Sequence, residues 1–287
     1  MARPNTAIQY PLFTTHNLEI PAGTLRAAGW EHLARDFPDS KLVVALLGIC
    51  QYGARIGYQS VHSSIKIHSN LTTANDNPAL VTAEITSAMR RGRLEVDPNR
   101  AGLPNEYTIS PTGLTDKSDG RERRIHHLSY HAGDTSSFND GIPPEYGAIK
   151  YTNIDDAIQA IQTLGQNCIL VKRDLESAFR HNPVSPLDTP LIGFHWAGEY
   201  YAKRFLPFGL RTAPYIFNLF AEVLHSILEE ELHHANPKIT IMPYLDDILM
   251  VLPRTGNLES YTETFGRLCF EVGLSIKESR NEQGTLA

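Results

Sequence analysis

The sequence predicts an α+β fold in which an antiparallel-rich sheet is backed by helices. Two short apolar runs, residues 239–242 and 248–252, are rich in aliphatic and β-branched side chains and flank a tight polar turn. Runs of this kind predict two strands of a hairpin. A third apolar run at 168–171 predicts a buried strand, and helical patterns precede and follow it. The resulting order of strand, helix, hairpin, helix and strand is typical of this fold class.

Composition indicates an ordinary globular protein. The 287 residues are 41% hydrophobic and 20% charged, which is enough for one large or two modest domains. No run is long enough to span a membrane and residues 1–14 lack a signal-peptide pattern, so we expect an intracellular protein without membrane contact. Three widely spaced cysteines predict reduced, buried thiols. The formal net charge of −6 argues against a general nucleic-acid binder, although the basic residues are clustered.

Residues 1–95 predict an N-terminal helical lead-in without obvious chemistry. Its clearest helix begins with Asn77 as N-cap and Pro78 in the first turn, and it ends near Gly92. Several arginines gather at the C-terminal end of this helix. We favour compensation of the helix dipole over nucleic-acid contact as their role. They are Arg90, Arg91 and Arg93.

A basic hairpin is predicted around the turn at 117–120, where Asp-Gly is a strong turn signal. A short strand is expected within 105–111, and the returning strand within 121–128. Long cations on a two-stranded flap could clamp a polyphosphate. A solvated edge strand protected by charge explains the same pattern, and the residues alone leave both interpretations open. The cations are Lys117, Arg121, Arg123 and Arg124.

Three aspartates form the candidate site. Asp246 and Asp247 are adjacent at the turn of the predicted hairpin, and a pair of this kind is most simply a solvated turn. Asp174, at the end of the predicted strand that begins at residue 168, adds a third carboxylate. Like charges this close are costly unless a cation lies between them. A divalent cation with oxygen ligands is therefore the favoured explanation.

Other helices and strands follow from capping residues and apolar patterns. We expect a strand at 200–205 and the start of another at 274–276. Gly209 lies in a loop ahead of a long helix, where a glycine lets a ligand or a nucleic-acid backbone approach closely. Three helices are predicted from their terminal residues. The first is capped by Asn153 or Asp155 and ends at Gly165. The second is capped by Thr212 and has Pro214 in its first turn. The third is capped by Asn257 and ends near Gly273.

Four motifs, taken in order, resemble those of reverse transcriptases, and in particular those of gypsy-like and related fungal retrotransposons. The resemblance covers roughly residues 110–285. One four-residue match is weak evidence, whereas four matches in the right order with the right elements between them are strong evidence. The motifs are Lys117…Arg123, Asp174…Phe179, Leu206-Pro207-Phe208-Gly209-Leu210-Arg211-Thr212-Ala213-Pro214 and Tyr244-Leu245-Asp246-Asp247.

The resemblance implies a right-hand polymerase with fingers and palm at 96–287, and palm motifs at about 166–180 and 206–287. It implies an RNA-directed DNA polymerase that adds deoxynucleotides to a primer paired with an RNA or DNA template. In that family the motif aspartates hold two Mg²⁺ ions, for which Mn²⁺ may substitute. The matching metal-site positions are the aspartates Asp174, Asp246 and Asp247, together with Leu175.

The resemblance also implies nucleotide-binding residues. Lys117 and Arg123 match residues that grip the triphosphate. Phe179, beside Ala178, matches the aromatic gate below the sugar. The Phe208-Gly209 pair matches a loop that packs on the incoming nucleotide and the template. RNA-dependent RNA polymerases usually carry Asp at the Phe179 spacing and Gly-Asp-Asp at the hairpin, so this alternative is disfavoured.

Three departures from the family pattern stand out. Arg280 aligns with a lysine that can protonate pyrophosphate, and Lys277 is nearby but off register; an arginine stays protonated and is a poor general acid. Pro243 is unexpected beside a central strand. The chain stops at Ala287, before the family's primer-grip hairpin, which predicts truncation ahead of the thumb. The alternative function is therefore an inactive remnant that only folds and binds nucleic acid.

Overall fold

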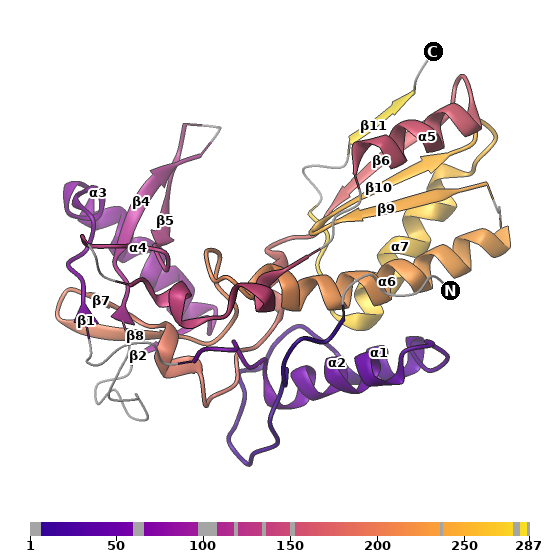
Figure 1. Ribbon diagram of the computed structural model, residues 1–287. Helices are drawn as coiled ribbons and strands as arrows, with labels where there is room; N and C mark the ends of the chain where they lie inside the picture. Colours follow the sequence, from indigo (N-terminus) through magenta and orange to yellow (C-terminus); the bar gives the residue numbers. More distant parts are fainter. Residues whose placement is uncertain are drawn as a thin grey trace.

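The computed structural model describes residues 7–59, 66–96, 108–117, 120–133, 136–149, 153–235, 238–277 and 282–285. Figure 1 shows two lobes, and the long helix α6 (Ala213–Ala235) runs from the middle of the molecule beneath the sheet of one of them. One lobe contains the four-stranded sheet and is called the sheet lobe below. The other contains the basic hairpin and two small sheets and is called the hairpin lobe. Antiparallel pairing backed by helices confirms the predicted α+β fold.

The sheet lobe is built on four antiparallel strands in the order β11-β6-β10-β9. Helices α6 and α7 lie on one side of this sheet and α5 on the other (Figure 1). Ile248 and Met250 pack in the main core, whereas Val251 packs in the cluster that contains α5. The alternation along one strand therefore buries both faces of the sheet. The elements are α5 (Ile154–Leu164), β6 (Ile169–Asp174), β9 (Thr240–Tyr244), β10 (Asp247–Leu252), α7 (Leu258–Val272) and β11 (Glu282–Thr285).

Pro243 lies in β9, which is the edge strand of this sheet. It stands opposite Ile248 of β10. An edge strand tolerates proline because one side of the strand has no ladder partner that needs its N–H group. The expectation that Pro243 adjoins a central strand is correct, and its place at the edge explains why it fits.

The local helix signals are largely confirmed. The Asn153 side chain accepts hydrogen bonds from the first turn of α5, so Asn153 rather than Asp155 is the cap. Asn257 caps α7 in the same way, and Gly273 ends that helix in the left-handed conformation. Thr212 precedes α6, but its hydroxyl donates to the carbonyl oxygen of Ile56 at 3.0 Å. That threonine therefore ties α6 to the N-terminal segment.

The hairpin lobe differs from prediction in its strand partners. The hairpin forms as expected, but the partner of β5 is Thr112–Asp116; the expected strand within 105–111 is Thr108–Ile109, which instead pairs in parallel with Lys66–Ile67. The strand expected at 200–205 is β8, the middle strand of another sheet. The elements are β1 (Lys66–Ile67), α3 (Thr72–Asp76), α4 (Pro78–Arg90), β2 (Leu94–Val96), β3 (Thr108–Ile109), β4 (Thr112–Asp116), β5 (Glu122–His126), β7 (Phe194–Trp196) and β8 (Glu199–Lys203).

Within the described part of the chain, four short 3₁₀ helices complete the connections. One of them, η3, begins four residues after Asp174, and η1 lies between the basic hairpin and α5 in the chain. They are η1 (Phe138–Gly141), η2 (Pro144–Gly147), η3 (Ala178–His181) and η4 (Thr189–Ile192).

The N-terminal helices α1 (Ala27–Leu33) and α2 (Ser40–Tyr52) lie below α6 and α7 in Figure 1. Trp30 is fully buried, and its ring meets Phe220 of α6 edge-on with the centroids 5.1 Å apart. A Cβ at Gly29 would overlap the carbonyl oxygen of Glu271 in α7. The first helices therefore share one core with the sheet lobe. No helix among the described residues is long and apolar enough to cross a membrane.

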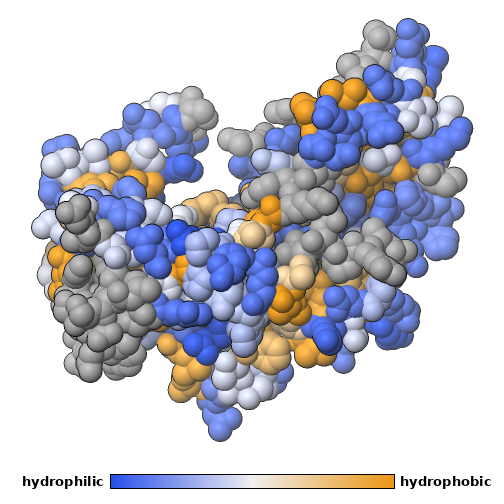
Figure 2. Space-filling view, viewed as in Figure 1, coloured by the Kyte–Doolittle hydropathy of each residue, from blue (hydrophilic) through white to orange (hydrophobic). Residues whose placement is uncertain are grey.

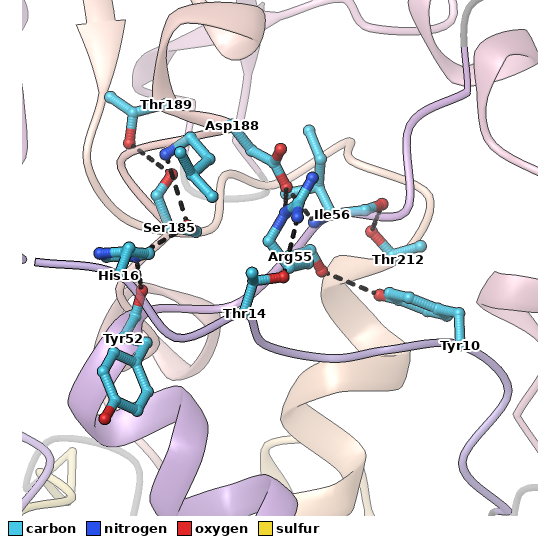
Figure 3. A network of polar contacts seen from close by, with 11 residues as sticks. Tyr10, Thr14, His16, Tyr52, Arg55, Ile56, Ser185, Asp188, Thr189 and Thr212 are labelled. Carbon is cyan, nitrogen blue, oxygen red and sulfur yellow. Dashed lines mark hydrogen bonds and ion pairs between the residues drawn. The ribbon is translucent and has the colours of Figure 1, made fainter. Parts of the chain in front are cut away.

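A polar network joins the N-terminal segment to the segment before η4 (Figure 3). Buried Asp188 accepts hydrogen bonds from Arg55 Nε at 2.8 Å and from the backbone N–H of Ile56 at 2.9 Å. Ser185, His16 and the Tyr52 carbonyl extend the network. Pairing of a buried carboxylate with both a guanidinium and a backbone donor offsets the cost of its desolvation.

Candidate active site

The hairpin register brings the three predicted aspartates to one end of the sheet. Asp247 is the direct cross-strand partner of Asp174, and Asp246 lies in the turn beside it. The backbone N–H of Leu175 donates to the Asp246 carbonyl at 2.9 Å. Leu245 has a φ of 55°, a left-handed conformation that tightens this turn. Residues far apart in the chain therefore converge.

The three aspartates give this end of the four-stranded sheet a negative charge. Burial raises the pKa of Asp246, and the neighbouring Asp247 and Asp174 raise it further. Two lysines partly balance the charge: Lys277 Nζ is 3.1 Å from Asp174 Oδ2, and Lys172 Nζ is 3.0 Å from Asp247 Oδ2. The site therefore favours additional positive charge.

The donor set fits a hard divalent cation because it consists of carboxylate oxygens without competing nitrogen or sulfur ligands. Among the described residues, however, no three acidic, histidine or cysteine side chains are close enough together to hold an ion as they stand. Ammonium groups instead occupy one oxygen each of Asp174 and Asp247. The two ammonium groups therefore offset part of the negative charge of these carboxylates.

Of the two candidates for proton donation, only Lys277 can be placed. Its backbone N–H donates to the Asp174 carbonyl at 2.8 Å, in addition to its side-chain contact. Although off register in the motif comparison, it lies at the carboxylate cluster. Arg280 lies outside the described residues.

The rings of Phe179, five residues after Asp174, and of Phe208 pack together and are called the aromatic shelf below. Phe179 is buried, and its centroid lies 4.9 Å from that of Phe208 and 5.9 Å from that of Phe217. Ala178 beside it is fully buried, whereas Phe208 is 48% exposed. Packing against Phe217 of α6 therefore fixes Phe179 and leaves one face of Phe208 open to a ligand.

The loop after Phe208 packs beneath the basic hairpin. Gly209 has a φ of 88°, and a Cβ there would lie 3.2 Å from the carbonyl oxygen of His126 at the end of β5. The loop therefore needs glycine both for its backbone conformation and for this close approach.

Asn139 fixes the same loop, and sequence reasoning missed it. Its Nδ2 donates to the Gly209 carbonyl and to Ser129 Oγ, both at 2.8 Å, and its Oδ1 accepts from the Arg211 N–H at 3.0 Å. The side chain is only 4% exposed. Asn139 lies in the four-residue 3₁₀ helix η1, which is too short to show a periodicity, and the one local signal is the capping box of Ser137 at the start of this helix.

Lys117 and Arg123 stand on the basic hairpin, apart from the carboxylates. Arg123 is exposed and pairs across the ladder with Thr115. Figure 1 shows the hairpin projecting from its lobe, and Figure 2 shows a hollow between its upper part and the sheet lobe. The structure thus brings the aspartates together and places Arg123, and Lys117 beside it, on the hairpin in the other lobe.

Comparisons with known proteins agree on one family. Residues 122–284 match the family model described as "Reverse transcriptase (RNA-dependent DNA polymerase)". The chain is similar to the Gag-Pro-Pol polyprotein of Human T-cell leukemia virus 2, at 25% identity over 181 residues, which is 61% of this chain and 11% of the polyprotein. It is also similar to Protein P of Duck hepatitis B virus, at 26% identity over 37% of this chain and 13% of that protein.

Two solved structures share the fold. The prototype foamy virus protease-reverse transcriptase matches 94% of this chain and 34% of its own, with 17% identity and a TM-score of 0.53. A foamy viral protease-reverse transcriptase in complex with double-stranded DNA matches 96% and 46%, with 16% identity and a TM-score of 0.54. The chain spans less than half of each relative. Its fold is shared with these reverse transcriptase structures.

The matched segment covers more than half of the chain and runs from the basic hairpin to the last strand of the sheet. It includes the aspartates, the aromatic shelf and the glycine loop. The chain therefore belongs to the reverse transcriptase (RNA-dependent DNA polymerase) family.

Proposed function

We propose that this chain is the RNA-directed DNA polymerase domain of a retrotransposon and adds deoxynucleotides to the 3′ end of a primer. The observation that carries the proposal is the pairing of Asp174 with Asp247 across β6 and β10, with Asp246 in the adjoining turn. The order of the motifs supports a gypsy-like source, with the fingers and palm at 96–287 and a lead-in at 1–95.

The carboxylates of Asp174, Asp246 and Asp247 and the backbone carbonyl of Leu175 would hold two Mg²⁺ or Mn²⁺ ions. When bound, the ions would lower the pKa of the primer hydroxyl and neutralise the triphosphate. The protein's part is to keep these oxygens together although burial and repulsion raise the pKa of Asp246. Cation binding relieves that repulsion.

Lys277 would exchange its contact with Asp174 for one with the departing pyrophosphate. Its ammonium group can donate a proton, and it lies next to the carboxylates. Arg280, the other candidate, stays protonated and would contribute charge and hydrogen bonds.

The aromatic shelf would select the sugar. Phe179 is wedged between Phe208 and Phe217, so its ring cannot turn aside for a 2′-hydroxyl. Lys117 and Arg123 would bind the triphosphate from across the hollow, and the template-primer, with RNA or DNA as template, would lie between the lobes.

Primer extension tests the proposal. We expect incorporation of dTTP on poly(rA) primed with oligo(dT), in Mg²⁺ or Mn²⁺. Asp246→Asn should lower the rate at least about 100-fold, because ligand loss removes several kcal/mol of transition-state stabilisation. Asp36→Asn, at an exposed aspartate before α2, is the matched control. Equal rates for the wild type and Asp246→Asn would favour the inactive remnant.

A further inference from the structure

A group of five cations lies where the hairpin lobe meets the segment after Asp174. Arg124 Cζ is 4.5 Å and Lys203 Nζ 5.9 Å from the centroid of the same ring, Phe194. Arg93 is one residue before Leu94, which pairs with Lys203 across β2 and β8. The group, called the basic cluster below, consists of Arg91, Arg93, Arg124, Arg180 and Lys203.

The charges of the basic cluster are poorly compensated. Among the described residues, the acidic side chains that act on it are Glu84 and Glu176, so five basic side chains face two carboxylates. No cluster member forms an ion pair within 4.0 Å with another described residue. The Nε of Arg124 is buried without a hydrogen-bond partner. Such an arrangement costs stability unless something else neutralises it.

Burial opposes the charge most strongly at Lys203. Its residue is 8% exposed, and burial, with Arg124 and Arg180 nearby, holds the pKa of Lys203 well below its usual range. The pKa of Arg124 is lowered to about 10, chiefly by burial, with Glu84 opposing the shift and Arg180 adding to it. A structural role would be better served by apolar side chains.

The members of the basic cluster differ in their exposure to solvent. Arg91 and Arg180 are exposed, Arg93 and Arg124 are half-buried, and Lys203 is buried behind them. An anion from solvent therefore meets the exposed Arg91 and Arg180 first, and the buried Lys203 ammonium then balances its negative charge.

The basic cluster adjoins the aromatic shelf but is separate from the cations proposed to grip the triphosphate. Arg180 Cζ lies 5.8 Å from the centroid of Phe208. Arg123 and Arg124 are successive residues of β5, so their side chains point to opposite faces of the hairpin. The half-buried Arg124 belongs to the inner face, and the exposed Arg123 to the outer one.

We infer that the basic cluster is a second phosphate-binding site, which takes a phosphate of the template strand or of the incoming nucleotide. A phosphate supplies the missing negative charge and several acceptor oxygens, and guanidinium groups match those oxygens in pairs. The inference deepens the proposed polymerase function by assigning residues to a group that both of its substrates carry.

The test removes the charge of Lys203, the buried member of the basic cluster. Lys203→Met keeps the apolar stem and should fold, because it removes a buried, unpaired charge. Lys41→Met, at an exposed lysine of α2, is the matched control. Arg93→Gln provides a second variant if Lys203→Met does not fold. Binding of a fluorescent RNA–DNA duplex is measured by anisotropy between 50 and 200 mM salt, without divalent ions, and binding of inorganic tripolyphosphate by thermal shift.

If the template supplies the phosphate, Lys203→Met weakens duplex binding about tenfold near 0.1 M salt and lowers the salt slope by about 0.7–0.9. If the nucleotide supplies it, the variant loses the thermal shift with tripolyphosphate and binds the duplex normally. Wild-type behaviour toward both probes, or a wild type that binds neither, overturns the inference. Neither assay needs catalysis, so a wild type that binds but extends no primer would contradict only the proposed function.

Discussion

At the scale of single residues, the ionised Asp246 side chain lowers the stability of the folded protein. Burial and the neighbouring carboxylates raise its pKa above the ordinary value of 3.8. Below that value the group is protonated in both the folded and the unfolded state, and the penalty vanishes. As the pH rises through the unfolded and then the folded pKa, the penalty grows, and it is complete above the folded pKa.

Asp246→Asn should therefore increase the free energy of unfolding at pH 7 and leave it nearly unchanged at pH 3. Urea unfolding without divalent ions measures both values. The Asp36→Asn control should show no such difference. A stabilisation of equal size at both pH values would contradict an electrostatic origin.

Phe179 is expected to determine sugar selection. Phe179→Val should raise ribonucleotide use relative to deoxynucleotide use by about 10- to 100-fold, the range that steric exclusion by a few atoms gives. Competition of UTP with dTTP in primer extension measures the ratio. Phe270→Val, at a ring that is 68% exposed, is the control. An unchanged ratio would remove the argument against an RNA polymerase.

At the scale of elements, the loop at Gly209 depends on one side chain. Asn139→Ala would leave the Gly209 carbonyl and the Arg211 N–H without their partner, at a cost of about 1–3 kcal/mol in stability. The KM for dTTP should rise more than kcat falls, because the loop positions the nucleotide. Asn139→Asp, which can still accept from Arg211, should lose less. Unchanged KM in both variants would limit Asn139 to a structural role.

Elements were predictable where their signals are local. Asn153 and Asn257 cap helices through bonds to their own first turns, so the sequence is sufficient to place them. Strand partners depend on distant residues. Thr112–Asp116 lacks a clear apolar alternation, and its pairing was missed for that reason. The side chain of Asn139 acts through tertiary contacts from the short helix η1, and no sequence pattern reveals such contacts.

At the scale of the whole molecule, α1 is packed too closely on α7 to be an appendage. Gly29→Ala should cost about 1–3 kcal/mol, since its Cβ would meet the backbone of Glu271. Gly266→Ala, in the same α7, has open space around its Cβ and should stabilise the helix by up to about 1 kcal/mol. Denaturant unfolding measures both changes. If Gly29→Ala lowered the stability of only a separate transition at low denaturant, the N-terminal helices would unfold independently, which would contradict this account.

The net charge shows how a sum over the molecule can mislead. The overall value of −6 argues against nucleic-acid binding. Folding nevertheless gathers the aspartates at one end of the sheet and the basic cluster beside the aromatic shelf. The sequence shows local groups of like charge, but only the fold shows which of these groups come together in space.

Binding of Mn²⁺ tests the central claim most directly, because Mn²⁺ can be counted by electron paramagnetic resonance. With a dideoxy-terminated primer-template and dTTP present, the account predicts two ions per chain in the wild type and in Asp36→Asn. It predicts fewer in Asp246→Asn. Equal numbers in the wild type and Asp246→Asn would contradict the claim that these converging aspartates form the metal site.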